Sequence, residues 1–123
     1  MSYRVIVCGG RDWPDQSAVD FELGQLLKID PHFVVIHGNC PTGADRFAEE
    51  WTDANHITTF AYPADWENEG RAAGPKRNER MVAAGADLCL AFWDGESRGT
   101  AHMIKCATRA GIPVRIVPAR GRG

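Results

Sequence analysis

The chain has 123 residues, of which 44% are hydrophobic and 24% charged, and its formal net charge at pH 7 is −2. A chain of this length forms one domain around a single core. The slightly acidic balance argues against binding of nucleic acid through a broad basic surface, so nucleic acid is not an expected partner. No apolar run is long enough to span a membrane and the first residues lack a signal-peptide pattern, so we expect a cytoplasmic protein without membrane contact.

The predicted elements alternate between strands and helices along the whole chain. Short runs rich in β-branched residues predict buried strands, and apolar residues at helical spacing predict the segments between them. In chain order we expect strand 3–8, helix 16–29, strand 33–37, helix 43–54, strand 57–62, helix 75–85, strand 88–93, helix 98–110 and strand 114–117. This alternation predicts an α/β fold, a single doubly wound, Rossmann-like parallel sheet of about five strands with helices on both faces. We expect strand order 3-2-1-4-5, with one domain over residues 1–118 and a basic tail over 119–123.

The cysteines do not indicate a metal centre. None of the four forms a CxxC pair, and Cys8 and Cys89 lie in strand-like apolar runs where a reduced thiol packs as a small hydrophobe. We therefore expect no bound metal, and no nicotinamide cofactor follows either, because the glycines do not form the GxGxxG fingerprint.

Glycines, basic residues and tryptophans concentrate in the loops that follow the predicted strands. Parallel α/β sheets bind ligands beyond the carboxyl ends of their strands, where the strand order reverses, which here is between the first and fourth strands. The loops expected at that edge cover residues 9–13, 37–45, 63–78 and 94–100. The opposite edge offers only short connectors, so this asymmetry predicts a ligand site at the carboxyl edge.

Each loop also has a purely structural interpretation. Gly9 and Gly10 either allow a tight turn or let backbone N–H groups approach a phosphate. Thr42 and Asp45 resemble a capping box, and the same glycine-bearing helix start suits an anion. The pair Gly99-Thr100 opens another helix near the same edge.

The tryptophans leave similar alternatives open. The segment 63–74 shows little periodicity and is long for a connector, which is typical of functional loops. Trp66 either pins this segment or stacks on a ligand. Trp13 and Trp93 flank the expected reversal point, where one of them could stack on a base and where Trp13 could form a wall of the pocket.

Four blocks of the sequence together resemble a known family. The blocks are CGGRDW, HGNCPTGAD, ADWENEGRAAGPKRNERM and AFWDGESRGTAHMI. In this order they resemble the YspA-like branch of the SLOG superfamily, over about residues 4 to 117. That superfamily includes the cytokinin-activating phosphoribohydrolases called LOG and the DNA-processing protein A domain. The resemblance implies a Rossmann-like fold that binds nucleotide-derived ligands.

The resemblance to LOG enzymes also implies roles for single residues. The stretch RNERM places Arg77, Asn78 and Met81 on a LOG motif whose arginine is catalytic. The stretch DGESRGTAHM keeps the phosphate-binding glycines and threonine of a second motif, at Gly95, Gly99 and Thr100. The position of the catalytic glutamate is Met103, and methionine supplies no carboxylate. If the protein is an enzyme, Arg77 with Asp45 or Glu96 would carry the reaction, with Asp94 and His102 as further substitutes for the missing carboxylate.

Two functions follow from these residues. The first is a sensor or sequestering protein that binds a nucleotide or an ADP-ribose-like derivative. The second is an N-glycosidase that acts on nucleoside 5′-monophosphates. The ligand-binding candidates are Gly9, Gly10, Arg11, Trp13, Gly38, Thr42, Gly43, Asp45, Arg77, Asn78, Gly95, Gly99 and Thr100. We also expect a homo-oligomer, as the resemblance to LOG implies. Met81, Met103 and Ile104 either form an apolar face on the third and fourth helices or pack in the core.

Overall fold

A five-stranded parallel sheet forms the centre of the protein in the computed structural model, which describes residues 2–119. The strand order is β3-β2-β1-β4-β5, as the sequence predicts, and every neighbouring pair is parallel. The order reverses between β1 and β4, because the chain first builds the sheet in one direction and then returns to the other side of β1. The strands are β1 (Arg4–Gly9), β2 (Val34–His37), β3 (Thr59–Ala61), β4 (Leu88–Phe92) and β5 (Val114–Val117).

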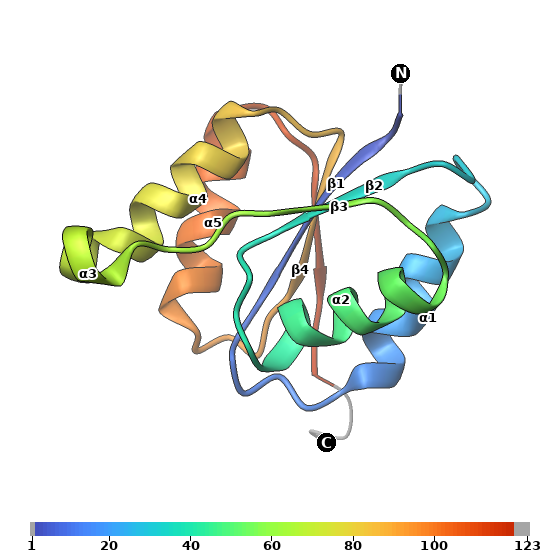
Figure 1. Cartoon of the computed structure of the whole chain (residues 1–123), viewed down its shortest axis with the longest axis horizontal. Coiled ribbons are helices and arrows are strands. Elements are labelled where there is room, and N and C mark those ends of the chain that lie inside the picture. The colour runs from blue at the N-terminus through green and yellow to red at the C-terminus, as the bar shows by residue number, and fades with distance from the viewer. Residues whose placement is uncertain (1, 120–123) are drawn as a thin grey trace.

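Helices cover both faces of the sheet, which confirms the predicted fold class (Figure 1). Alternate residues of β1 point to opposite faces. Val5 and Val7 pack in the cluster with α1 and α2, whereas Ile6 and Cys8 pack in the cluster with α4 and α5. No helix within residues 2–119 is long and apolar enough to cross a membrane. The long helices are α1 (Gln16–Leu26), α2 (Gly43–Ala54), α4 (Ala73–Ala83) and α5 (Arg98–Arg109).

The segment between β3 and α4 contains more regular structure than the sequence predicts. It forms a four-residue helix, α3 (Trp66–Glu69), and a 3₁₀ turn, η1 (Gly70–Ala72). The Glu69 carboxylate binds the Arg80 guanidinium at 2.8 Å, which ties the segment to α4. Helices this short show no periodicity, and the ion pair joins residues 11 positions apart, so local sequence patterns do not reveal it.

Trp66 lies against the start of α4. Its side chain is 54% exposed, and a β-carbon at Gly74 would lie 3.3 Å from the indole Cη2. The indole therefore rests on the helix where a glycine leaves room for it. This position favours the structural interpretation of Trp66, in which it pins the segment to α4.

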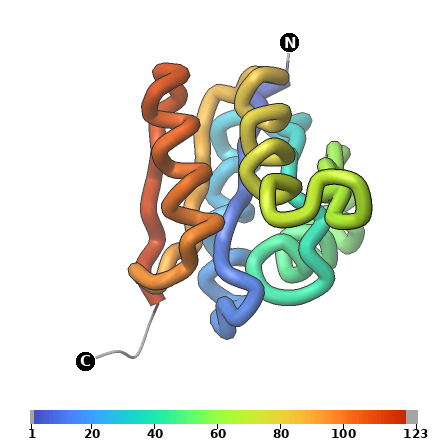
Figure 2. Tube along the Cα trace, turned by 90° about the vertical axis from the view of Figure 1, so that its left-hand side faces the viewer, coloured from blue at the N-terminus to red at the C-terminus, as the bar shows by residue number. Residues whose placement is uncertain are grey.

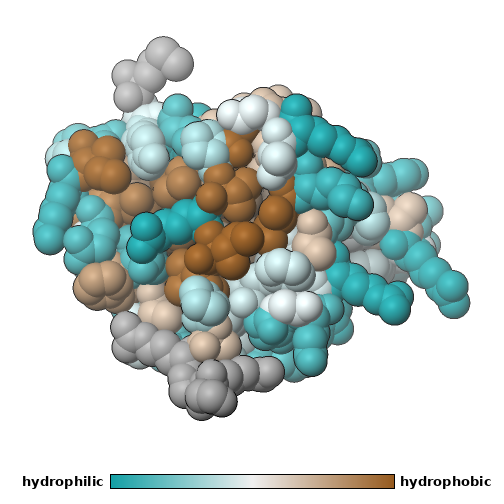
Figure 3. All heavy atoms as spheres, turned by 180° about the vertical axis from the view of Figure 1, so that it is seen from behind, coloured by the Kyte–Doolittle hydropathy of each residue, from teal (hydrophilic) through white to brown (hydrophobic). Residues whose placement is uncertain are grey.

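The surface on the β5 side of the sheet carries apolar side chains that are surrounded by hydrophilic ones (Figure 3). β5 is an edge strand, and its Ile116 is 48% exposed. Arg115 of the same strand binds Glu22 of α1 at 2.8 Å. Of the two roles left open for Met81 and Met103, the structure shows core packing and not an exposed apolar face, because both side chains are only 1% exposed and belong to the core under α4 and α5.

Candidate ligand-binding site

A cavity of about 420 Å³ lies at the carboxyl ends of β1 and β4, where the strand order reverses. The loop after β1, the loop after β2 and the start of α5 meet at this end of the molecule (Figure 2). The volume falls within the range of about 300–1,000 Å³ that is typical of small-molecule sites. The predicted site residues that line it are Gly9, Gly10, Arg11, Gly38, Asp45, Arg77, Asn78, Glu96, Gly99 and Thr100.

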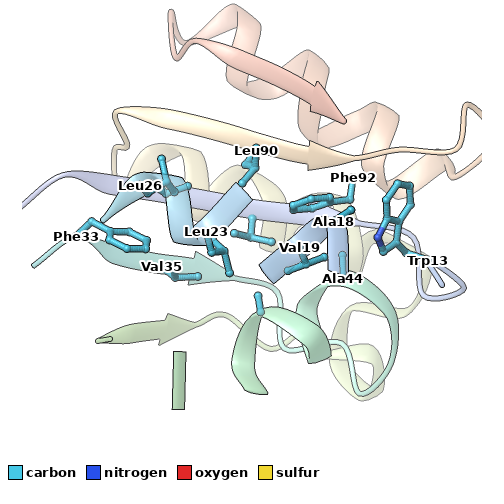
Figure 4. Close-up of a cluster of buried hydrophobic side chains, with 13 residues drawn as sticks. Trp13, Ala18, Val19, Leu23, Leu26, Phe33, Val35, Ala44, Leu90 and Phe92 are labelled. Carbon is cyan, nitrogen blue, oxygen red and sulfur yellow. The ribbon is translucent and has the colours of Figure 1, made fainter. Parts of the chain in front are cut away.

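Trp13 does not reach this cavity. Its ring packs against Phe92 with the two centroids 5.6 Å apart, and its side chain is 3% exposed in the core between the sheet and α1 (Figure 4). The indole N–H donates to the carbonyl of Asp15 at 3.0 Å. The structure therefore places Trp13 under the loop after β1 as core, and the expected aromatic wall is absent there.

Thr42, Gly43 and Gly95 also lie outside the cavity lining. The Thr42 hydroxyl donates to the carbonyl of Arg11 at 2.8 Å, so it joins the two loops instead of capping α2. Gly43 has a φ of +71°, and a β-carbon there would collide with the carbonyl of Gly10. Both residues therefore hold the loop after β1 against the start of α2. Gly95 has a φ of +89° in the turn before α5, with open space around it.

Asp45 stabilises the loop after β2. Its carboxylate accepts a hydrogen bond from the Cys40 amide at 3.1 Å, so the expected capping box with Thr42 does not form. Asp45 is 6% exposed. Burial raises the pKa of its carboxyl, while backbone donors from Cys40 and Gly38 and the charge of Arg77 act in the opposite direction.

His37 lies behind this loop at the end of β2 and is 1% exposed. Its Nδ1 accepts from the Asn39 amide at 3.0 Å, so Nε2 carries the proton and donates to the Glu49 carboxylate at 2.5 Å. Asn39 adopts a left-handed backbone with a φ of +59°, which asparagine tolerates. The pair His37–Glu49 thus fixes the loop from the side away from the cavity.

Arg77 reaches across the cavity wall to the same loop. Its Nη1 donates to the carbonyl of Gly38 at 2.6 Å, and its Nε donates to Oδ1 of Asn78 at 3.0 Å. The Asn78 amide in turn donates to the carbonyl of Gly99 at 3.3 Å. Arg77 and Asn78 therefore connect the loop after β2, α4 and the start of α5 around the cavity.

The start of α5 is held by a set of short-range hydrogen bonds. The Asp94 carboxylate accepts from the amides of Glu96 at 2.8 Å and Ser97 at 3.1 Å. The Ser97 hydroxyl lies 2.9 Å from that of Thr100 and caps the helix. The first N–H groups of a helix lack partners within the helix and carry its positive dipole end. Arg98 and Gly99, the first two residues of α5, both line the cavity.

The cavity has a buried, largely apolar floor and a charged rim. The rim includes the exposed side chains of Arg11, Asp12, Glu96 and Arg98. The resemblance to LOG motifs singles out Met81 and Met103, but sequence reasoning missed Val7, Cys8 and Arg98 as site residues. Arg98 could have been found as the first residue of the predicted helix after the DGES turn. The floor consists of Val7, Cys8, Met81 and Met103, all of which are buried.

The Cys8 thiol in the floor of the cavity is not a reactive nucleophile. The Sγ atoms of Cys8 and Cys89 are 3.9 Å apart, and both side chains are buried. The contact with Cys89 and burial raise the pKa of the Cys8 thiol, so it stays protonated and packs as an apolar group. Within residues 2–119, no three His, Cys, Asp or Glu side chains are grouped so that they could hold a metal ion.

The sheet order defines a Rossmann-like α/β domain, and a cavity of small-molecule size lies at its reversal point. A family model described as the YspA, cpYpsA-related SLOG family matches residues 3–68, and the chain belongs to this family. The chain is also 43% identical over 117 residues to the Gene 61 protein of Mycobacterium phage D29, which covers 90% of this chain and 93% of that protein.

Two solved structures share the fold. The molybdenum cofactor binding protein from the phototrophic bacterium Rippkaea orientalis superposes with a TM-score of 0.73 and 20% identity, covering 94% of this chain and 76% of its own. The Moco carrier protein from Chlamydomonas reinhardtii superposes with a TM-score of 0.72 and 18% identity, covering 98% of this chain and 79% of its own.

Proposed function

We propose that this protein binds a phosphate-bearing nucleotide or nucleotide derivative and acts as a sensor or sequestering protein. The observation that carries the proposal is the cavity at the β1/β4 reversal point, whose rim combines Arg11, Arg98 and the start of α5. By their names, the two solved structures with this fold bind or carry a molybdenum cofactor, which supports a small-molecule ligand here.

The phosphate belongs at the rim in this proposal. Arg11 and Arg98 are exposed and border the cavity, and the α5 dipole adds positive potential beside them. Arg77 directs Nε and Nη1 into the protein, so we assign it first to holding the loop after β2. A charge-assisted hydrogen bond contributes about 1.5–3 kcal/mol, which makes a rim arginine measurable by substitution.

Binding without hydrolysis is the better-supported function. Met103, which stands at the position of the LOG glutamate, lines the floor of the cavity and supplies no proton. Of the carboxylates expected to replace it, Glu96 is exposed at the rim, whereas Asp45 and Asp94 accept backbone hydrogen bonds. The N-glycosidase function remains the alternative, since these carboxylates border the same cavity.

Calorimetry with a nucleoside 5′-monophosphate and the matching nucleoside tests the proposal. We expect the monophosphate to bind and the nucleoside to bind at least about tenfold more weakly, because it lacks the charged contacts at the rim. Arg98→Ala should remove most of this difference. Arg109→Ala, at the far end of the same helix, is the matched control and should leave it unchanged.

The proposal would be overturned by a set of purine and pyrimidine monophosphates that all fail to bind, or by equal effects of the two arginine variants. Mass spectrometry of protein purified under native conditions would identify a retained ligand directly. A retained ligand without a phosphate group would also contradict the proposal.

A further inference from the structure

We propose that the deep end of the cavity selects a purine ring whose edge presents adjacent N–H donors, as guanine does, through the carboxylate of Asp45. This inference rests on the proposed function and adds the ligand's orientation and the class of its base. The ring lies inward against the floor, and the phosphate lies outward at the rim.

A flat ligand ring would pack against sulfur atoms on the floor of the cavity, because none of the floor residues that the structure describes is aromatic. Among the described residues that line the cavity, none is aromatic. Met81 and Met103 are each 1% exposed and belong to the cluster beneath the cavity, and Cys8 lies beside them. Polarizable thioethers make favourable contacts with aromatic rings at about 5 Å. A heteroaromatic ring therefore finds its packing partners at the deep end.

Asp45 is the charged acceptor at this depth. It is 6% exposed and lines the cavity, and the Cys40 amide uses one of its acceptor positions. A carboxylate has about four acceptor positions, so capacity remains for ring donors even with a second backbone donor, from Gly38. The side-chain amide of Asn78, which is also buried in the cavity wall, already makes hydrogen bonds to Arg77 and to the carbonyl of Gly99.

The same carboxylate fixes the ligand's orientation. A phosphate beside Asp45 would place two negative charges together in a buried environment, which is unfavourable. The cations that remain exposed, Arg11 and Arg98, lie at the rim with the start of α5. The phosphate therefore points outward, and the base is the part of the ligand that reaches Asp45.

The donor pattern decides between the purines. Guanine presents a ring N–H next to an amino group, and these two donors can pair with both oxygens of one carboxylate. Adenine presents an amino group next to a ring nitrogen that is an acceptor, which opposes a carboxylate oxygen. A site built to pair with donors rejects an analogue that lacks them, because the buried acceptor is left unpaired.

Calorimetry of the full chain with GMP, AMP and IMP tests this inference. We expect GMP to bind at least about tenfold more tightly than AMP, with IMP between them because it keeps the ring N–H and lacks the amino group. Asp45→Asn should abolish the preference, and Asp53→Asn, farther along the same helix, should keep it. Thermal unfolding of both variants checks that they fold.

The outcomes separate the inference from the proposed function. AMP binding as tightly as GMP, or a preference that survives Asp45→Asn, overturns the inference and leaves nucleotide binding intact. If no monophosphate binds, the proposed function fails and the inference fails with it. If Asp45→Asn does not fold, the affinities of the unaltered protein still test the inference, which requires GMP to bind most tightly, IMP less tightly and AMP most weakly.

Discussion

The guanidinium of Arg77 occupies the space that a side chain at position 38 would need. Its Nη1 lies 2.6 Å from the carbonyl oxygen of Gly38, and a β-carbon on Gly38 would collide with the same nitrogen. The absence of a side chain at Gly38 therefore has a packing cause that involves Arg77, in addition to its place in the cavity lining.

Gly38→Ala should displace Arg77 and loosen the loop after β2. We expect a loss of about 1–2 kcal/mol in the free energy of unfolding, because the hydrogen bond to the Gly38 carbonyl is strained or broken, together with weaker ligand binding. Urea denaturation and calorimetry measure the two effects. Gly24→Ala is the control: it lies in α1 with open space around it and should stabilise the protein by about 0.5–1 kcal/mol. Equal effects of the two variants would contradict this.

Asp20→Asn should stabilise the protein at neutral pH. Asp20 Oδ1 is buried without a hydrogen-bond partner among the described residues, and burial, followed by the charge of Glu50, raises the pKa of Asp20 above 3.8. The ionised carboxylate therefore costs stability above its folded pKa, and the cost vanishes below pH 3.8, where both states are protonated. Urea denaturation should show a gain at pH 7 that shrinks in acid. A gain that is independent of pH would contradict the electrostatic cause.

Asp30→Asn should destabilise the protein at neutral pH, in contrast to Asp20→Asn. The Asp30 carboxylate accepts from the amides of Tyr3 and His32, both at 2.9 Å, and these donors lower its pKa below 3.8. Its contribution to stability is therefore present above pH 3.8 and is lost as the pH falls through the folded pKa. The variant should unfold at lower urea than the unaltered protein at pH 7 and at similar urea in strong acid. A deficit that persists in acid would contradict this.

The unaltered protein should release base from nucleoside monophosphates slowly or not at all. Loss of a general acid–base group costs roughly 10²–10⁴-fold in rate, and Met103 stands at the position of the LOG glutamate. Chromatography of reactions with purine and pyrimidine monophosphates measures this, with Met103→Glu alongside and its unfolding temperature recorded because position 103 is buried. Brisk turnover that Arg77→Ala abolishes would show that another carboxylate has replaced the LOG glutamate, and Asp45 and Glu96 would then be the first residues to substitute.

We expect a homo-oligomer that uses the exposed edge at β5. Ile116 is 48% exposed there, and edge strands present unpaired backbone groups to a partner. Ile116→Asp should reduce the mass measured by light scattering, whereas Ile29→Asp, at an exposed position after α1, should not. A mass near 13.5 kDa for the unaltered protein at all concentrations would contradict the expectation.

The fold could be predicted because its signals are local. Apolar runs such as residues 33–37 and helical spacing such as that of Val19 and Leu23 depend only on neighbouring residues, and alternation then fixes the sheet class. The segment 66–72 could not be predicted, because a four-residue helix and a 3₁₀ turn are too short to show periodicity, and the ion pair that ties them to α4 joins distant residues, Glu69 and Arg80.

The sequence predicts at which edge of the sheet the site lies, but not which side chains are buried beneath it. The carboxyl ends of parallel strands lie at one edge of a sheet, so Gly10, Gly38, Gly43, Gly99 and Thr100 are expected to share one cavity, and all of them except Gly43 line it. Burial is a property of the whole fold, so the sequence could not show that Trp13 packs on Phe92. For the same reason it could not show that Met81 and Met103 form the floor.

The hydrogen bond from the Trp93 indole to the carbonyl of Ser97, at 3.1 Å, gives the protein an intrinsic optical probe. Ser97 both caps α5 and lines the cavity, so a ligand that shifts the start of the helix alters the polarity around this indole. Of the other three tryptophans, Trp13 is buried in the core, Trp51 packs against Phe33 with the ring centroids 6.0 Å apart, and Trp66 is half exposed to water. None of these three lines the cavity. Changes in tryptophan emission on ligand addition can therefore be traced to one residue, and occupancy can be followed in real time without a label.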